Sequence, residues 1–423
     1  MNSRLTQNTS LSFLVAISFA FAAFSQNKTT LSISESGHYF LDGKLQPLFW
    51  QGDTQWELFH LFSASQAEGL LLERKKQGFN FIQVMATGVF PEWGQMKGVD
   101  FTSPQEAWLD ANPLRPNENY FRRVDSIVRA AEKNNMMLVV GIFHAQDVEK
   151  RKITMQNVKA WAKWLTGRYK TASNIIWSMY PHADSLSLPF IEATVQGIKE
   201  GDGGRHLITV HPDPSPKSSS FIHAAPWLSF NTLQTWDTDY INYEMVILDY
   251  KKSPAKPAVN GEARYEEEDG TTPFQTRRAG YWSCMAGGFY SYGHLGNWKS
   301  PLTWRKWYLS DGAKQMKIMG DFFRSIPWWN LTPDQSIFVN PIKGNVAAYS
   351  RNRDLLLAYL TAKQETTIRL DKLKSKYASG WWINPLTGIR SKAGDYDCSK
   401  EYVFRLPEDW EDAILFFQSK TDI

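Results

Sequence analysis

Cysteine is scarce in this chain of 423 residues, which contains only Cys284 and Cys398. Because the two lie in different predicted domains, we expect two free, buried thiols and no disulfide framework. No group of cysteines and histidines has the spacing of a structural zinc site. No GxGxxG follows a predicted strand, so nothing indicates a dinucleotide cofactor. The sequence therefore predicts neither a bound metal nor an organic cofactor.

The chain also lacks a large excess of positive or negative charge. The 47 basic and 43 acidic residues give a formal net charge of +4, and the basic runs are as short as Arg74-Lys75-Lys76. Without a polybasic arm, the sequence predicts no binding to nucleic acid. After Ser25, no apolar run is long enough to cross a bilayer, so we expect no membrane span.

One long apolar run lies at the start of the chain. Leu11 to Phe24 is almost wholly apolar, follows Arg4, and is completed by the tripeptide Ala23-Phe24-Ser25. A short basic region, an apolar core of this length and small residues at a cleavage point are typical of a signal peptide. We expect residues 1–25 to be removed and the mature chain to be secreted or periplasmic.

Aromatic residues are abundant, at 14% of the chain with 18 tryptophans. An indole has an apolar face and one N–H, which suits the apolar C–H face and polar edge of a sugar ring. A Trp-rich core and domain seam would account for most individual tryptophans. The excess as a whole favours a carbohydrate ligand.

Short β-prone runs alternate with amphipathic helical stretches through most of the chain. The β-prone runs are Pro47–Asp53, Phe79–Met85, Met136–Phe143, Asn174–Met179, Leu207–His211, Trp227–Gln234, Lys256–Glu262 and Gly287–Tyr292. The helical stretches include Ser65–Gln77, Glu118–Asn134, Gln156–Tyr169, Pro189–Lys199 and Asp311–Arg324. The alternation predicts an α/β fold, a (β/α)8 TIM barrel over residues 26–327. A doubly wound open sheet is the competing fold, and its usual glycine fingerprint is missing.

Two smaller β elements accompany the predicted barrel. Thr29–Leu45 predicts an N-terminal β-hairpin that turns at Asp42-Gly43. Residues 328–423 predict a small C-terminal antiparallel β-sandwich, because short β-prone runs alternate there with turn residues. These runs are Val346–Ser350, Leu355–Leu360, Thr366–Leu370, Gly380–Ile383, Tyr402–Arg405 and Ala413–Gln418.

Polar and aromatic side chains gather where the predicted barrel strands end, and barrel enzymes carry their active site at that rim. The candidates for contact with a substrate are Asp53, Trp56, His211, Gln234, Trp236, Tyr265 and His294. These residues also have structural interpretations. Asp53 could cap the following helix, the two tryptophans could belong to the core, and a lone histidine is often a satisfied structural group.

The chemistry that suits this rim is glycoside hydrolysis, which needs two carboxyl groups across the scissile bond. Glu262 ends the seventh predicted strand, and the missing side chain of Gly261 before it would let a substrate come close. Arg264 or Tyr265 could keep its carboxylate ionised. We expect Glu262 to be the nucleophile of a retaining glycosidase that acts on oligo- or polysaccharides. A structural ion pair with Arg264 is the alternative, and Glu266–Asp269 is expected to be a solvated loop face.

Several sequence blocks carry a family resemblance. The chain contains FWQGDTQWELFHLFSASQAEGLLLERKKQGFNFIQVMATG, NIIWSM, KPAVNGEARYE and GGFYSYGHLGNW. These blocks resemble the apiosidase-like glycoside hydrolases. The later block WWINPLTG resembles the small β domain that follows the barrel in that family and is often labelled collagen-binding. The resemblance implies a barrel hydrolase that acts on side chains of plant-type polysaccharides, with its nucleophile at Glu262.

The sequence departs from the family where the general acid is expected. The family usually has Gly-Gly-Asp after the fourth strand, with the Asp as acid/base, whereas this chain reads SMYPHAD up to Asp184. His182 takes the position of the Asp without gaps, and Asp184 takes it after a shift of two residues. Asp184 could instead cap the helix that starts near Ser187.

Two other functions remain open for the sequence. A carbohydrate-binding barrel that has lost its general acid would keep Glu262 as a relic. A collagen-binding or peptidase role follows from the C-terminal resemblance alone, and the chain has neither HExxH nor a Ser or Cys nucleophile motif.

Overall fold

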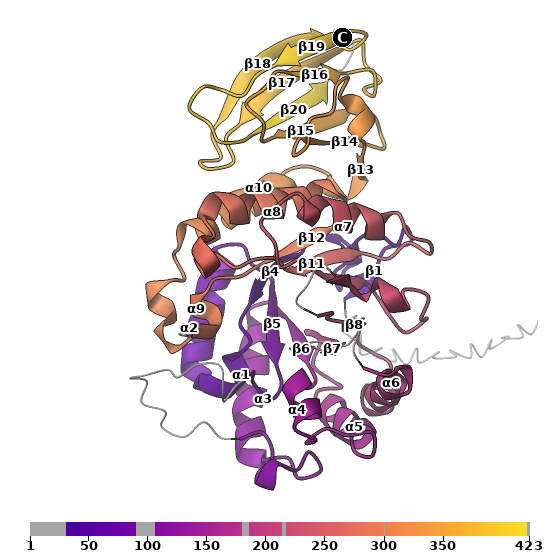
Figure 1. Cartoon of the computed structure of the whole chain (residues 1–423), viewed down its shortest axis with the longest axis vertical. Coiled ribbons are helices and arrows are strands. Elements are labelled where there is room, and N and C mark those ends of the chain that lie inside the picture. The colour runs from indigo at the N-terminus through magenta and orange to yellow at the C-terminus, as the bar shows by residue number, and fades with distance from the viewer. Residues whose placement is uncertain (1–30, 90–105, 180–185, 214–216, 300, 421–423) are drawn as a thin grey trace, which may run out of the picture.

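The computed structural model describes residues 31–89, 106–179, 186–213, 217–299 and 301–420. Figure 1 shows a large part built of helices around a parallel sheet, with a smaller β domain stacked on one side of it. Helices α7 (Ile241–Tyr250), α8 (Pro273–Met285) and α10 (Asp311–Arg324) lie on the side that faces the β domain.

Eight parallel strands form the wall of the larger part. They are β4 (Gln51–Thr54), β5 (Phe81–Met85), β6 (Met137–Gly141), β7 (Ile175–Met179), β8 (Ile208–Val210), β10 (Asn231–Gln234), β11 (Ala258–Glu262) and β12 (Phe289–Tyr292). They lie in the order β8-β7-β6-β5-β4-β12-β11-β10, and β9 (Lys217–Ser218) pairs antiparallel with β10. The two end strands meet where the Ser229 amide donates to the Ile208 carbonyl at 2.8 Å. The predicted (β/α)8 barrel is confirmed.

Local sequence signals mark the start of α2 and the end of α6 among the barrel helices. The longer ones before α7 are α2 (Ala64–Lys76), α3 (Glu118–Lys133), α5 (Val158–Arg168) and α6 (Leu188–Asp202), and the short ones are α1 (Leu58–Leu61), α4 (Ala145–Glu149) and α9 (Gly296–Lys299). Ser63 and Gln66 form a capping box that starts α2. Gly203, with φ of 72°, ends α6 in the left-handed conformation that glycine adopts most easily. No helix in the described residues is both long and apolar enough to cross a membrane.

An N-terminal sheet closes the bottom of the barrel. It consists of β1 (Ser32–Ile33), β2 (Phe40–Leu41) and β3 (Pro47–Leu48), and the turn between β2 and β3 contains the predicted Asp42-Gly43. The expected strand Pro47–Asp53 is therefore two strands, β3 and β4. Phe40 is fully buried and contacts the rings of Trp50, Phe81, Phe230 and Phe289. This aromatic plug fills the end of the barrel opposite the predicted site.

The C-terminal domain is antiparallel, as predicted. Its six-stranded sheet has the order β13-β14-β15-β20-β17-β18, and β16 pairs with β19 in a separate ladder. The bounds are β13 (Leu331–Pro333), β14 (Val346–Ser350), β15 (Leu355–Leu360), β16 (Thr366–Arg369), β17 (Tyr377–Ile383), β18 (Arg390–Asp397), β19 (Glu401–Phe404) and β20 (Ala413–Ser419). Both thiols are free and buried, as expected, with Cys284 in the barrel and Cys398 in the β domain.

A buried ion pair joins the two domains. Arg277 on α8 donates from Nε and Nη2 to both carboxylate oxygens of Asp412, at 2.9 and 2.8 Å. The Tyr359 hydroxyl also donates to Asp412, at 2.6 Å, and the ring of Tyr359 stacks on Tyr281 of α8. Arg277 also donates to Gln315 on α10 at 2.6 Å. Apolar residues of both domains share one continuous core around this pair, so the domains form one packed unit.

Asp412→Ala should destabilise the whole chain, because it leaves the Arg277 guanidinium buried without its partner. Loss of one member of a buried pair costs about 3–5 kcal/mol. Glu411→Ala is the matched control. The Glu411 side chain is 59% exposed and lies 3.3 Å from the same guanidinium, and an exposed pair contributes at most about 1 kcal/mol. The free energy of unfolding from urea titration measures both changes. An equal loss of unfolding free energy in the two variants would contradict the assignment of Asp412 as the main partner of Arg277 between the domains.

Candidate active site

Glu262 is the last residue of β11, at the carboxyl end of the barrel wall, and only 2% of it is exposed. Its neighbour in register on β10 is Gln234. The glycine before it has a different role from the one expected. A Cβ on Gly261 would lie 2.8 Å from the Thr232 methyl, so Gly261 is required by close packing inside the barrel and not by the approach of a substrate.

Two donors hold one oxygen of the Glu262 carboxylate. The Tyr265 hydroxyl donates a close hydrogen bond to Oε1, and the Trp56 indole N–H lies 3.3 Å from the same oxygen. The indole N–H is also 2.8 Å from the Tyr265 hydroxyl oxygen, so the three groups form a closed triangle. Buried donors of this kind stabilise a negative charge. The triangle fixes the carboxylate without any help from Arg264, which pairs with Asp269 instead.

His211 faces the other oxygen of the same carboxylate. Its Nε2 lies 3.4 Å from Oε2 of Glu262, and its Nδ1 lies 3.1 Å from the Pro212 carbonyl oxygen. Because a carbonyl oxygen only accepts, Nδ1 carries a hydrogen, and a neutral ring then presents a lone pair to the carboxylate. A hydrogen on Nε2 as well would make His211 a third donor to the carboxylate.

The two predicted sugar platforms differ in their surroundings. Trp56 is buried, and its ring meets His211 edge to face at 5.9 Å, so it supports the carboxylate. Trp236 is half-buried, follows β10, and contacts Tyr265 edge to face at 5.4 Å. Gln234 is buried beside Glu262 in register, and its side-chain oxygen Oε1 has no hydrogen-bond partner in the part of the chain that the structure describes. An acceptor without a donor is costly when it is buried, and a sugar hydroxyl would satisfy it.

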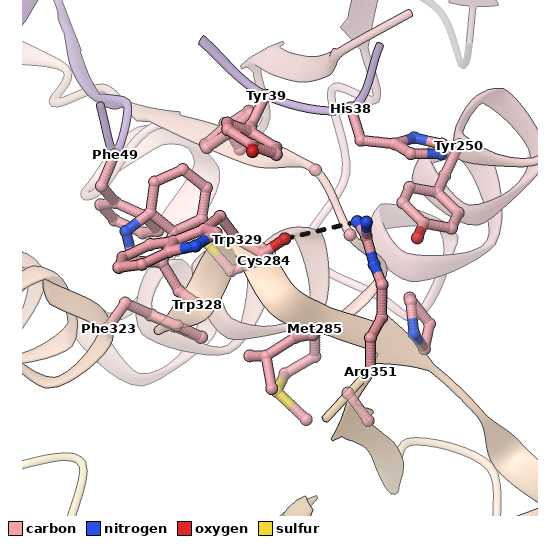
Figure 2. A pocket seen from close by; sticks show the side chains of 16 residues that line it. His38, Tyr39, Phe49, Tyr250, Cys284, Met285, Phe323, Trp328, Trp329 and Arg351 are labelled. Atoms are coloured by element: carbon pink, nitrogen blue, oxygen red, sulfur yellow. Dashed lines mark hydrogen bonds between the residues drawn. The ribbon is translucent and has the colours of Figure 1, made fainter. Parts of the chain in front are cut away.

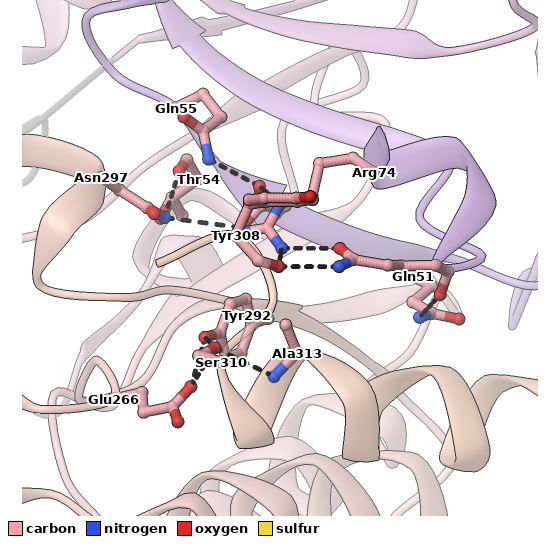
Figure 3. A network of polar contacts seen from close by, with 12 residues as sticks. Gln51, Thr54, Gln55, Arg74, Glu266, Tyr292, Asn297, Tyr308, Ser310 and Ala313 are labelled. Carbon is pink, nitrogen blue, oxygen red and sulfur yellow. Dashed lines mark hydrogen bonds and ion pairs between the residues drawn. The ribbon is translucent and has the colours of Figure 1, made fainter. Parts of the chain in front are cut away.

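Asp53 was expected to contact substrate or to cap a helix, and the structure gives it another role. Its carboxylate is fully buried and accepts from Arg74 Nε at 2.8 Å and from the Gln55 amide at 2.7 Å. Asn297, in the short helix α9 that follows β12, approaches the other oxygen at 3.4 Å. Figure 3 shows Arg74, Gln55, Asn297 and Thr54 in this network between the first and last strands of the barrel. Asp53 is therefore a structural ion-pair partner that joins β4 to the segment after β12.

The acidic run Glu266–Asp269 is only partly the solvated face that its composition predicts, because Glu267 and Asp269 are exposed and the other two are not. Glu266 and Glu268 are both buried, and Glu266 is bonded to groups at the start of α10. Sequence reasoning missed Glu266 because four adjacent acidic residues give no indication of which one is buried. The partners come from residues far along the chain, and no local signal identifies them.

His294 is a buried histidine with a defined tautomer. Its Nδ1 accepts from the Gly296 amide at 2.9 Å, so Nε2 carries the hydrogen of the neutral ring and lies 3.5 Å from Glu267. The ring stacks on Trp307 with centroids 5.6 Å apart. His294 therefore has a satisfied structural environment, and it also lines a pocket on the loop after β12.

The expected general acids lie outside the described residues. Asp184 and His182 follow β7, whose last residue is Met179. In the strand order of the barrel, β7 is separated from β11 by β8 and β10 on one side and by four strands on the other. The end of β7 at Met179 therefore lies on a different side of the barrel mouth than Glu262.

A second pocket lies at the opposite end of the barrel. Figure 2 shows it between the N-terminal sheet, the ends of α7 and α8, and the start of the β domain, with Tyr39, Tyr250, Trp328 and Arg351 around it. It adjoins the beginning of β12, so it lies at the amino ends of the strands. Barrel enzymes use the other end. Within the described residues, no three His, Cys, Asp or Glu side chains group closely enough to hold a metal ion.

The comparisons with known proteins agree with this geometry. A family model described as "Apiosidase-like, catalytic domain" matches residues 34–330, and one described as "Putative collagen-binding domain of a collagenase" matches residues 332–418. A solved structure named "Glycoside hydrolase" has a TM-score of 0.79 at 22% identity, covering 94% of this chain and 98% of its own. A family 5 glycoside hydrolase from Bacteroides vulgatus has a TM-score of 0.78 at 22% identity, covering 92% and 94%. No curated relative matches the sequence.

The barrel and the catalytic-domain match define the class of protein as a glycoside hydrolase, an enzyme that acts on carbohydrate. Because the catalytic-domain model covers more than half of the chain, the protein belongs to the apiosidase-like family. The resemblance seen in the sequence blocks is confirmed for both domains.

The surroundings of His294 make folding depend on pH. Burial lowers the pKa of His294 from its usual value of 6.5. The unfolded chain then binds the proton more readily, so this residue makes the protein lose stability as the pH falls below 6.5 towards the folded pKa. His294→Gln should reduce that loss by about 1 kcal/mol for each unit of pKa difference. Urea titration at pH 8 and pH 5 measures the free energy of unfolding of both proteins. If the variant differed from wild type by the same free energy at both pH values, the prediction would be contradicted.

Proposed function

We propose that the protein is a retaining glycoside hydrolase and that Glu262 is its nucleophile. The observation that carries the proposal is the environment of the Glu262 carboxylate. It is buried at the carboxyl end of β11, and Trp56, Tyr265 and His211 hold its two oxygens. A nucleophile must be ionised and rigidly oriented, and the two hydrogen bonds that Oε1 accepts support both requirements.

The proposed reaction takes place in two steps. A carboxylate oxygen of Glu262 attacks the anomeric carbon, the glycosidic C–O bond breaks, and the leaving oxygen takes a proton from the general acid. Water then loses a proton to the same acid/base residue and attacks the glycosyl ester, which releases Glu262 as a carboxylate. Tyr265 and Trp56 keep their hydrogen bonds to the carboxylate in the free enzyme, so they set the direction of attack.

Substrate recognition is proposed to involve Gln234 and Trp236, which extend from β10 next to Glu262. Among the residues that the structure describes, the Gln234 Oε1 atom has no hydrogen-bond donor, so it is available to a sugar hydroxyl. Trp236 offers a half-buried indole beside Tyr265 for stacking on the sugar ring. The proposed substrates are side chains of plant-type or other complex polysaccharides, in line with the sequence resemblance. Export through the N-terminal signal is part of the proposal, because polysaccharides are too large to enter the cytoplasm and must be hydrolysed outside it.

Glu262→Gln should lower turnover by about a thousandfold or more, because an amide cannot form the glycosyl ester. The change keeps size and shape, so sugar binding and thermal unfolding should remain close to wild type. Glu244→Gln, on the exposed side of α7, is the matched control and should be fully active. The measurement is hydrolysis of a panel of plant and algal glycans, followed by kinetics on the best substrate. A Glu262→Gln variant that kept a tenth of wild-type activity would contradict the assignment.

The general acid should come from the loop after β7, with Asp184 as the first candidate and His182 as the second. An aryl glycoside with an acidic phenol needs little protonation, whereas a sugar leaving group needs a full proton transfer. Asp184→Ala should therefore slow hydrolysis of the natural glycan much more than that of the aryl glycoside. The same selective loss in His182→Ala alone would move the role to His182. If neither variant showed the selective loss, the segment after β7 would not supply the acid, and Asp237 or another group would have to be considered.

A further inference from the structure

Glu266 is buried four residues after Glu262, and three donors surround its carboxylate. The Gly312 amide donates to Oε1 at 3.0 Å, and the Ser310 hydroxyl donates to Oε2 at 2.8 Å. The Tyr292 hydroxyl at the end of β12 makes a third, close hydrogen bond to Oε2. Ser310 is the N-cap of α10 and Gly312 lies in its first turn, where the helix dipole favours a negative charge. Figure 3 shows Glu266, Tyr292 and Ser310 pointing toward one another.

Gly312 is the position that allows this contact. A Cβ at residue 312 would lie 2.3 Å from Oε2 and 2.8 Å from Cδ of Glu266. Any larger residue at 312 must therefore displace the carboxylate. Its φ is not in the left-handed region, so glycine is required here by space and not by backbone conformation.

The backbone of Glu266 is fixed as firmly as its side chain. Its amide donates to the Gly293 carbonyl at 2.9 Å, and its carbonyl accepts from the Leu295 amide at 2.9 Å. The Tyr265 ring lies directly on Gly293, where a Cβ would come within 2.1 Å of it. The segment that bears Tyr265 is thus held between β11, the loop after β12 and the start of α10.

We propose that Glu266 is a positioning residue, which fixes this segment so that the Tyr265 hydroxyl stays on Glu262. The inference rests on the proposed role of Glu262 as nucleophile. Glu266 acts through the backbone of residues 262–266 and not by contact with the substrate. Misplacement of a reacting group by about 1 Å can cost about a hundredfold in rate, so loss of this attachment should lower kcat while KM changes little.

The test uses the full-length protein and three variants. Gly312→Ala displaces the Glu266 carboxylate, although alanine is the better helix former. Glu266→Gln keeps an oxygen for the Gly312 amide and an NH2 group for the two hydroxyl oxygens, so it should retain more activity. Asp311→Asn is the matched control, because Asp311 lies in the same turn, its side chain is 69% exposed, and it pairs with Lys314. The probes are the best glycan of the panel and the 4-nitrophenyl glycoside of its sugar.

Gly312→Ala should lower kcat by about 10- to 100-fold with KM within about threefold, and Glu266→Gln should fall between it and wild type. Hydrogen–deuterium exchange should be faster in Gly312→Ala at the Glu266 and Leu295 amides, and Asp311→Asn should match wild type in every measurement. If the exchange became faster but kcat stayed at the wild-type value, the positioning role would be wrong while Glu262 kept its assignment. If Gly312→Ala failed to fold, wild-type kcat in Glu266→Gln would lead to the same conclusion. Full activity of Glu262→Gln in the same assays would overturn both proposals.

Discussion

The active end of this barrel depends on how a buried carboxylate is stabilised. An ionised carboxylate loses its hydration when it is buried, and only donors at fixed positions can replace the lost water. For Glu262 these are the Tyr265 hydroxyl and the Trp56 indole, and the His211 ring lies 3.4 Å from the other oxygen, so the three groups come from three different strand ends. Each group reaches Glu262 only if β4, β8 and β11 keep their places in the barrel wall. The geometry of the site therefore depends directly on the geometry of the barrel wall.

Two other buried carboxylates, Asp53 and Asp412, are also held by fixed donors. Arg74 on α2 pairs with Asp53 on β4, and Asn297 of α9 approaches the same carboxylate. Arg277 pairs with Asp412 and joins the barrel to the β domain. Both arginines make hydrogen bonds from more than one nitrogen, which suits the planar guanidinium group. Helix α10 links the Arg277–Asp412 pair to Glu266. Its first turn binds the Glu266 carboxylate, and Gln315 in the next turn accepts a hydrogen bond from Arg277.

Much of the fold could be predicted because buried parallel strands are almost continuously apolar. Each of the eight predicted runs overlaps one barrel strand, although Pro47–Asp53 also includes a strand of the N-terminal sheet. The strand β18 gave no such signal, since most of its side chains are exposed or half-buried. The site was predictable where the chain itself places a residue at a strand end, as for Glu262. The roles of Asp53 and Glu266 could not be predicted in this way, because their hydrogen-bond donors Arg74 and Gly312 lie 21 and 46 residues further along the chain.

The most direct test of the account is to trap the covalent intermediate. A 2-deoxy-2-fluoro glycoside of the sugar that the enzyme releases slows both steps and lets the glycosyl ester accumulate. Mass spectrometry of the digested protein then locates the sugar. The account predicts one added sugar on the peptide that contains Glu262, bound to that residue. A sugar on another carboxylate, or efficient turnover of the natural glycan with inversion at the anomeric carbon, would contradict it.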